Sequence, residues 1–219
     1  AIIWMDEQDS KINKIGPDMI DTFNPMMDEL EKDSEVRAAV MISRKKDFIA
    51  GADIEAFANV KKEGDWQPIA KKGHEILDRI QKSKKPIVAA INGACMGAGL
   101  EIALACAARV ASDNPKTIMS LPEVKLGLLP GGGGTQRLPR LVGIQKALDM
   151  MLTGKNIFAY PAKKMGLVDR IATKSALLDA AIILANQIAK KPFKREDKRS
   201  GMDKFLEGNP ITRNIIFKK

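Results

Sequence analysis

The sequence predicts an α/β fold made of repeated strand–helix and strand–strand–helix units. Short apolar runs of strand length alternate with amphipathic stretches of helical spacing, and turns of small residues separate them. The run at residues 87–91 is continuously apolar, as expected for a strand that is buried on both faces of a sheet. A length of 219 residues fits one domain with a substantial core.

Residues 1–5 predict the first strand. One helical face follows, marked by Ile20, Phe23, Met27 and Leu30. Because Pro25 lacks an N–H group, this helix is expected to begin late or to kink at that position. Residues 37–42 predict a second strand, which leads into a tight turn of small residues at 48–53.

The next helical stripe consists of Ile69, Gly73, Ile76, Leu77 and Ile80. After the strand at 87–91, a glycine-rich turn leads into an alanine-rich helix over roughly 98–108, whose small side chains permit close packing. Residues 117–119 predict a further short strand.

Four consecutive glycines at 131–134 precede a helix with a basic start, and a second helix is expected at 145–152. A short helix at 161–165 and a strand at 167–171 come next. The last amphipathic helix is marked by Leu177, Leu178, Ala181, Ile182, Ala185 and Ile188.

We expect residues 1–189 to form the main domain and residues 190–219 to form a charged segment followed by the start of a helical region. The chain starts inside a predicted strand and ends in basic residues, so we expect a piece of a longer protein. No apolar run approaches the length of about 20 residues that a membrane span needs, and no signal peptide is evident. A cytoplasmic protein is expected, or one of the mitochondrial matrix in a eukaryote.

A net charge of +9 favours an anionic partner, either nucleic acid or a phosphorylated small molecule, although it also serves solubility. With one Tyr and two Trp, little aromatic surface is available for base stacking, and no nucleic-acid-binding motif is present. We therefore expect no nucleic-acid partner.

Cys95 and Cys106 lie among apolar residues and are expected to be buried, reduced thiols. The only histidine, His74, excludes a site with several histidine ligands, and we expect no metal. His74 lies in a lysine-rich amphipathic stretch, which favours a surface or half-buried helix residue.

Glu101 and Glu123 are the candidate catalytic residues, since each lies beside a glycine-rich segment and carboxylates can move protons. The turn before Ala98 presents free N–H groups at a helix start, where a developing oxyanion can be held. The alternative for Glu101 is a surface carboxylate in the first turn of a helix. Its apolar neighbours instead suggest burial, and a buried carboxylate needs a partner or a task.

Glu123 alone could be an ordinary exposed turn residue, but its leucine neighbours and the glycines at 131–134 favour a functional role. These glycines lack the Gly-Lys-Ser/Thr ending of a phosphate loop, so a tight turn passing close to a ligand is expected. Asp53 can cap a helix, and the same small-residue turn can offer the N–H of Ala52 as a second oxyanion donor.

Three segments together resemble the enoyl-CoA hydratase (crotonase) family. They are Phe-Ile-Ala-Gly-Ala-Asp-Ile at 48–54, Lys-Pro-Ile-Val-Ala-Ala-Ile-Asn-Gly at 85–93, and the stretch from Leu-Pro-Glu at 121–123 to Arg137. Gly154 and the stretch at 162–168 fit as well, so the match runs in order over about residues 1–170. Within the family, the chain is most similar to the hydratase module of multifunctional fatty-acid oxidation proteins.

The resemblance implies the crotonase fold, a right-handed spiral of ββα units that is commonly assembled into trimers, here possessing only part of its C-terminal helices. It implies an acyl-CoA thioester as substrate and no further cofactor. The N–H groups of Ala52 and Ala98 would form the oxyanion hole, and that of Gly131 would position a water. Glu101 would help to activate this water for attack at Cβ, and Glu123 would protonate Cα.

For the CoA part, the resemblance suggests contacts from Ala50, Asp53 and Ile54. The candidate cations for the CoA phosphates are Lys61, Lys62, Lys71 and Lys72. The alternative is that these lysines only form a solvated helix face. Glu55 stands where some relatives have a lysine.

The resemblance implies hydration of trans-2-enoyl-CoA to 3-hydroxyacyl-CoA in β-oxidation, with Δ3–Δ2 enoyl-CoA isomerisation as an added activity. The alternatives are another crotonase-type reaction on acyl-CoA, or an acyl-CoA-binding fragment with little turnover. The partners expected are the acyl-CoA substrate and further copies in a homotrimer or a larger fatty-acid oxidation assembly.

Overall fold

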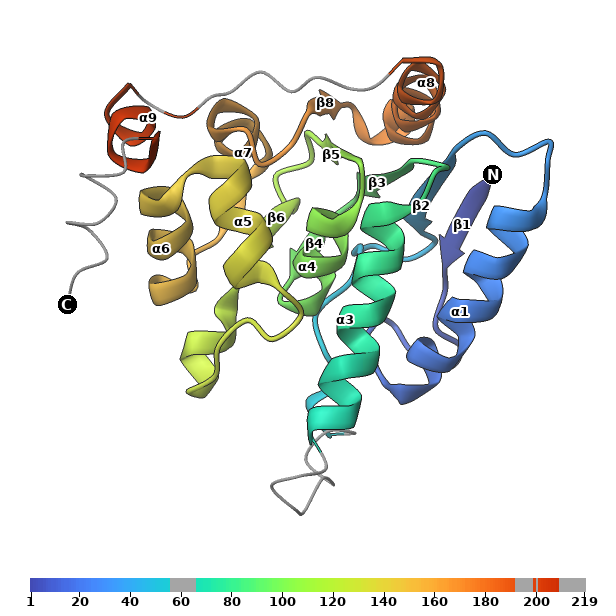
Figure 1. The fold of residues 1–219 in the computed structure, drawn as a ribbon, viewed down its shortest axis with the longest axis horizontal. Coiled ribbons are helices and arrows are strands. Elements are labelled where there is room, and N and C mark those ends of the chain that lie inside the picture. Colours follow the sequence, from blue (N-terminus) through green and yellow to red (C-terminus); the bar gives the residue numbers. More distant parts are fainter. Residues whose placement is uncertain (56–65, 192–198, 200, 209–219) are drawn as a thin grey trace.

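A computed structural model describes residues 1–55, 66–191, 199 and 201–208. Its centre is a five-stranded, all-parallel sheet in the order β1-β2-β3-β5-β8 (Figure 1). The strands are β1 (Ile2–Met5), β2 (Ala39–Ser43), β3 (Ile87–Ile91), β5 (Ala108–Ser112) and β8 (Arg170–Ala172). The register pairs Ile2 with Val40 and Val40 with Val88.

Side chains of the central strands alternate between two hydrophobic clusters, as strand geometry requires. On one face, Val40, Val88 and Val110 pack with buried residues of α8 (Leu177–Lys190). On the other face, Met41 and Ala89 pack with the buried sides of three helices. These are α1 (Pro17–Lys32), α3 (Trp66–Lys82) and α4 (Ala98–Ala105). The parallel sheet is therefore covered on both sides, as the apolar run at 87–91 predicts.

A second, smaller sheet forms beside the first in the order β4-β6-β7. It contains β4 (Ala94–Met96), β6 (Ile118–Ser120) and β7 (Ile157–Phe158). Around it lie η2 (Pro122–Leu126), α5 (Gly134–Val142), α6 (Ile144–Thr153) and α7 (Ala159–Met165). A short turn η3 (Lys174–Ala176) precedes α8, and α9 (Gly201–Gly208) is the last described element.

Most predicted elements are confirmed, with three corrections. The first concerns α1, which begins at Pro17 and continues through Pro25 instead of beginning late. Proline at the start of a helix is favoured, because the first N–H groups have no partner within the helix. Phe23, Met27 and Leu30, which lie before and after Pro25, all pack in the same core cluster.

The second correction concerns residues 98–112. The alanine-rich helix ends at Ala105, Cys106 adopts an extended backbone, and a strand that the sequence did not predict begins at Ala108. The guanidinium group of Arg109 explains the early end, because its Nη1 donates to the carbonyls of Ala103 and Cys106 at 3.0 and 3.1 Å. Carbonyls at the end of a helix need such partners.

The third correction is the strand expected at 167–171, which is displaced to Arg170–Ala172. Leu167 and Val168 are instead buried in the core ahead of the strand, and the N–H of Asp169 donates to the carbonyl of Arg109 at 2.9 Å. Within the charged segment expected at 190–219, residues 201–208 form α9, and most of the rest lies outside the described residues.

Both cysteines are buried and unpaired, as predicted, and burial raises the pKa of the Cys106 thiol to about 12. No helix of the described residues is long and apolar enough to cross a membrane. Among the same residues, no group of three or more His, Cys, Asp or Glu side chains could hold a metal ion.

Candidate active site

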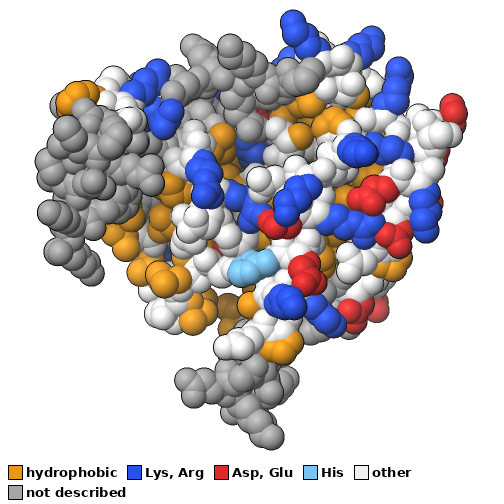
Figure 2. All heavy atoms as spheres, in the orientation of Figure 1, with side chains coloured by type: hydrophobic (Ala, Val, Ile, Leu, Met, Phe, Trp, Pro, Cys, Tyr) orange, Lys and Arg blue, Asp and Glu red, His pale blue; other side chains and the backbone are white. Residues whose placement is uncertain are grey.

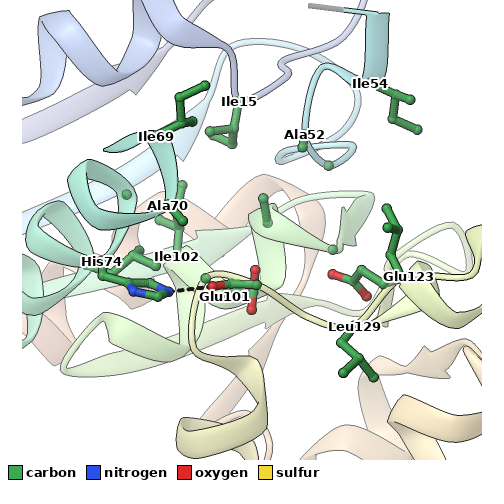
Figure 3. Close-up of a pocket in the computed structure, with 18 of the residues that line it drawn as sticks. Ile15, Ala52, Ile54, Ile69, Ala70, His74, Glu101, Ile102, Glu123 and Leu129 are labelled. Carbon is green, nitrogen blue, oxygen red and sulfur yellow. Dashed lines mark hydrogen bonds between the residues drawn. The ribbon is translucent and has the colours of Figure 1, made fainter. Parts of the chain in front are cut away.

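A cavity of about 490 Å³ lies between the turn at 50–54, helices α3 and α4, and the glycine-rich segment before α5. Most of its lining is apolar. Figure 3 shows Glu101 and Glu123 projecting into it from opposite sides. It brings together seven of the eight residues expected at the site, namely Ala50, Ala52, Ile54, Ala98, Glu101, Glu123 and Gly131.

Asp53 is the expected site residue that does not line this cavity. Its carboxylate pairs with Lys14 at 2.7 Å and accepts a hydrogen bond from the N–H of Glu55 at 3.2 Å. The second contact is the one that a helix-capping aspartate makes. Of the four lysines considered for the phosphates, Lys71 and Lys72 are exposed on α3, and the other two, Lys61 and Lys62, lie outside the described residues.

Glu101 is buried in the first turn of α4, with 3% of its surface exposed, so a surface carboxylate is excluded. Its Oε1 accepts a hydrogen bond from the N–H of Gly134 at 2.7 Å. Burial raises the pKa of the Glu101 carboxyl group, whereas the amides of Gly134 and Gly132 act against this shift. The two amides therefore help to keep this buried carboxylate ionised.

Glu123 lies in η2 and has no comparable support. Its Oε2 is buried without a hydrogen-bond partner among the described residues. Burial, opposed by a hydrogen bond from its own backbone and assisted by the nearby charge of Glu101, raises the pKa of Glu123 to about 7. Because the two carboxyl groups interact, they titrate as a coupled pair.

Ala52 and Ala98 provide two N–H groups at the cavity that no hydrogen bond of the described residues uses. Ile15 forms a parallel bridge with Ala52, in which the bonds run from Ile15 N–H to Gly51 and from Asp53 N–H to Ile15. The N–H of Ala52 therefore points away from this bridge. Ala98 is the first residue of α4, where N–H groups have no partner within the helix.

A close backbone approach holds the segments of these two donors together. A Cβ atom on Gly99 would lie 2.5 Å from the carbonyl oxygen of Ile49, so only glycine fits there. The N–H of Met96 also donates to Ile49 at 3.0 Å. The turn that carries Ala52 is thus packed directly against the start of α4.

His74 is a lining residue that the sequence interpretation did not place at the site. It lies in α3 and is exposed, as expected for a surface helix residue. Its Nε2 lies 2.5 Å from the carbonyl oxygen of Gly131. The partner is 57 positions away in the sequence, so no local pattern could reveal this contact.

Known proteins resemble this chain in both sequence and fold. A family model described as enoyl-CoA hydratase/isomerase matches residues 1–210. The fatty acid oxidation complex subunit alpha of Shewanella loihica is 49% identical over the whole chain, and that of Idiomarina loihiensis is 46% identical. The chain spans 31% of the length of each of these curated relatives.

Solved structures show the same fold. A crystal structure of enoyl-CoA hydratase from Bacillus anthracis superposes with a TM-score of 0.79 at 29% identity, covering 87% of this chain and 72% of that one. Pseudomonas aeruginosa DspI also gives 0.79 at 32% identity, with 87% and 76% covered. These matches confirm the predicted crotonase fold, and the chain belongs to the enoyl-CoA hydratase/isomerase family.

Proposed function

We propose that this chain hydrates trans-2-enoyl-CoA to 3-hydroxyacyl-CoA in β-oxidation. The observation that carries the proposal is the unequal pair of carboxyl groups in one cavity. Glu101 is held by backbone amides, and Glu123 has a buried, unpartnered oxygen and a pKa of about 7. One group is suited to accept a proton and the other to donate one near neutral pH.

The N–H groups of Ala52 and Ala98 would bind the thioester oxygen. As a nucleophile attacks Cβ, negative charge develops on this oxygen, and preorganised backbone donors stabilise such charge in the transition state. Removing one donor of this kind typically costs about 10²–10³ in kcat.

The proton transfers balance if the two glutamates have different roles. Glu101 accepts a proton from water while the hydroxyl oxygen bonds to Cβ, and the electrons of the double bond move towards the thioester oxygen. Protonated Glu123 then donates its proton to Cα as the carbonyl is restored. A second water relays the proton from Glu101 to Glu123 before the next turnover, and the N–H of Gly131 would position the attacking water.

The shape of the cavity supports an acyl thioester. Its lining is almost entirely apolar apart from the two glutamates and His74, which suits a hydrocarbon chain with one polar reacting end. Ala50 and Ile54 lie on the side of the oxyanion turn, and Ile54 is 57% exposed. We propose that the CoA moiety passes this side, with Lys71 and Lys72 available to its phosphates.

The relatives suggest the wider setting. Because they are named as subunits of a fatty acid oxidation complex, we propose that the chain works within a larger assembly, with the homotrimer as the simplest form. No cofactor is needed for the proposed proton transfers. We also propose a cytoplasmic location, which the bacterial sources of the relatives support.

The test is the loss of ultraviolet absorbance of an enoyl thioester on mixing with the chain, with the product identified by mass spectrometry. Hydration adds the mass of one water, whereas isomerisation leaves the mass unchanged and hydrolysis releases free CoA. Binding of acyl-CoA in a calorimeter without any turnover would refute the proposal in favour of a binding module. Glu123→Gln should bind acyl-CoA like the unchanged chain but lose hydration.

A further inference from the structure

Helix α3 presents a polar edge to the glycine-rich segment that precedes α5. His74, Asp78 and Gln81 are spaced by four and three residues, so they lie on one face of the helix. Arg137 connects two of them to the segment, donating to Asp78 at 2.9 Å and to Gln81 at 2.8 Å. It also donates to the carbonyl of Gly132 at 2.9 Å.

His74 reaches the same segment directly, through its contact with the carbonyl oxygen of Gly131 (dashed line in Figure 3). A carbonyl oxygen can only accept, so Nε2 must carry the hydrogen in this contact. In Figure 2 the pale-blue histidine side chain lies at the molecular surface beside acidic and basic side chains. A substitution there leaves the buried core intact.

The peptide between Gly131 and Gly132 links this contact to Glu101. In a planar trans peptide, the C=O and the N–H point in opposite directions. The C=O belongs to Gly131 and faces His74, and the N–H belongs to Gly132, which lies directly against the Glu101 carboxyl group, because a Cβ atom on Gly132 would lie 2.6 Å from its Oε2. A hydrogen bond to the carbonyl also polarises the peptide and strengthens the N–H as a donor.

The second amide donor to Glu101 is anchored differently. The N–H of Gly134 belongs to the peptide whose carbonyl is that of Gly133, and this carbonyl accepts bonds from the N–H groups of Gln136 and Arg137. The backbone of α5 therefore fixes one donor. The amide of Gly132 belongs to the peptide whose carbonyl is that of Gly131, and this carbonyl is held by the His74 side chain of α3.

We propose that His74 is a positioning residue for Glu101, which acts through the peptide between Gly131 and Gly132. The inference rests on the proposed hydration and adds to it a residue outside the glutamate pair. His74 touches neither the substrate nor the reacting water in this role. Loss of its N–H leaves Arg137 holding the segment at the neighbouring carbonyl, so the effect is confined to one peptide.

The kinetic test compares His74→Ala with His74→Gln, whose side-chain amide can replace the Nε2 donor. Loss of one neutral hydrogen bond predicts a decrease in kcat of about 3- to 10-fold for the alanine variant, with KM within about twofold. The glutamine variant should recover most of kcat. Glu75→Ala is the matched control, because Glu75 is exposed on the same helix and does not line this cavity.

An amide NMR measurement tests the same inference without turnover. In His74→Ala, the Gly132 amide proton should move upfield while that of Gly134 stays in place, and His74→Gln should restore the first signal. A Gly132 signal that is unchanged in His74→Ala overturns the proposal, as does an unchanged kcat. If the unchanged chain hydrates no enoyl thioester, the proposed function fails, and the Gly132 signal alone decides the role of His74.

Discussion

Glu123 should give the hydration rate a basic limb near neutral pH. Its carboxyl group has a pKa of about 7, so about half of it is protonated at pH 7, about a tenth at pH 8 and about a hundredth at pH 9. Only the protonated form can donate to Cα. We therefore expect kcat/KM to fall about fivefold between pH 7 and 8 and about tenfold over the next unit.

The direction of this limb follows from the cause of the shift. Burial disfavours the charged form of Glu123, so the active acid is retained below pH 7 and is lost as the pH rises. Bound substrate excludes more water from the cavity, so the limb in kcat should lie at higher pH than the limb in kcat/KM. Glu101 must be ionised, and its titration should produce the acidic limb.

The assay follows the enoyl-thioester absorbance across pH 5–10 at constant ionic strength, for the unchanged chain and for Glu123→Gln. The variant should lose about 10²–10⁴-fold in kcat/KM and should show no limb near pH 7 in its residual rate. A residual rate that kept this limb would assign it to another group and refute the reasoning.

Three further substitutions test the surroundings of the pair. Gly132→Ala places a Cβ about 2.6 Å from Oε2 of Glu101, so kcat should fall up to about 10²-fold with an unchanged circular dichroism spectrum; an unchanged kcat would contradict this. Ala98→Pro removes one proposed oxyanion donor at a helix start, where proline is tolerated. In the same absorbance assay kcat should fall about 10²–10³-fold. Full activity would show that Ala98 is not part of the oxyanion hole. Arg109→Met removes a buried guanidinium group that pairs with Asp169 at 3.4 Å and donates to three carbonyls, so it should cost about 3–5 kcal/mol in urea unfolding, and a cost below about 1 kcal/mol would contradict this.

The sequence predicted best those elements whose environment is uniform along their length. The strand at Ile87–Ile91 is buried at every position, so its apolar run alone marks it. The end of the helix near residue 152 was predicted from the presence of Gly154, and in the structure this glycine adopts the left-handed conformation that ends helices. The burial of Glu101 followed from its apolar neighbours.

The missed elements depend on partners that are distant in the sequence. The strand β4 has three residues and exists through its pairing with β6. The strand β5 contains the fully buried Arg109. Because a charged residue is typical of polar segments, the sequence did not indicate a buried strand there. The guanidinium group is satisfied by carbonyls of Ala103, Cys106 and Leu167 together with Asp169, and this combination exists only in the folded chain.

The candidate site shows the same division. The two glutamates and the two alanine donors were predicted from their motifs, and the structure places all four around one cavity. The sequence could not predict the different environments of the two glutamates. The amides of Gly132 and Gly134 act on Glu101, whereas burial dominates at Glu123. His74 was missed as a site residue for the same reason.

The contact between Gly99 and Ile49 also determines when the site can form during folding. It joins two segments 50 positions apart along the chain, and such contacts form only after a long loop has been closed. Helices α3 and α4 can acquire their hydrogen bonds before that event, but Ala52 and Ala98 cannot yet face the same oxygen. Recovery of hydration after dilution from denaturant should therefore lag behind recovery of the helical signal. The return of activity then marks the moment when the two distant segments have come into contact.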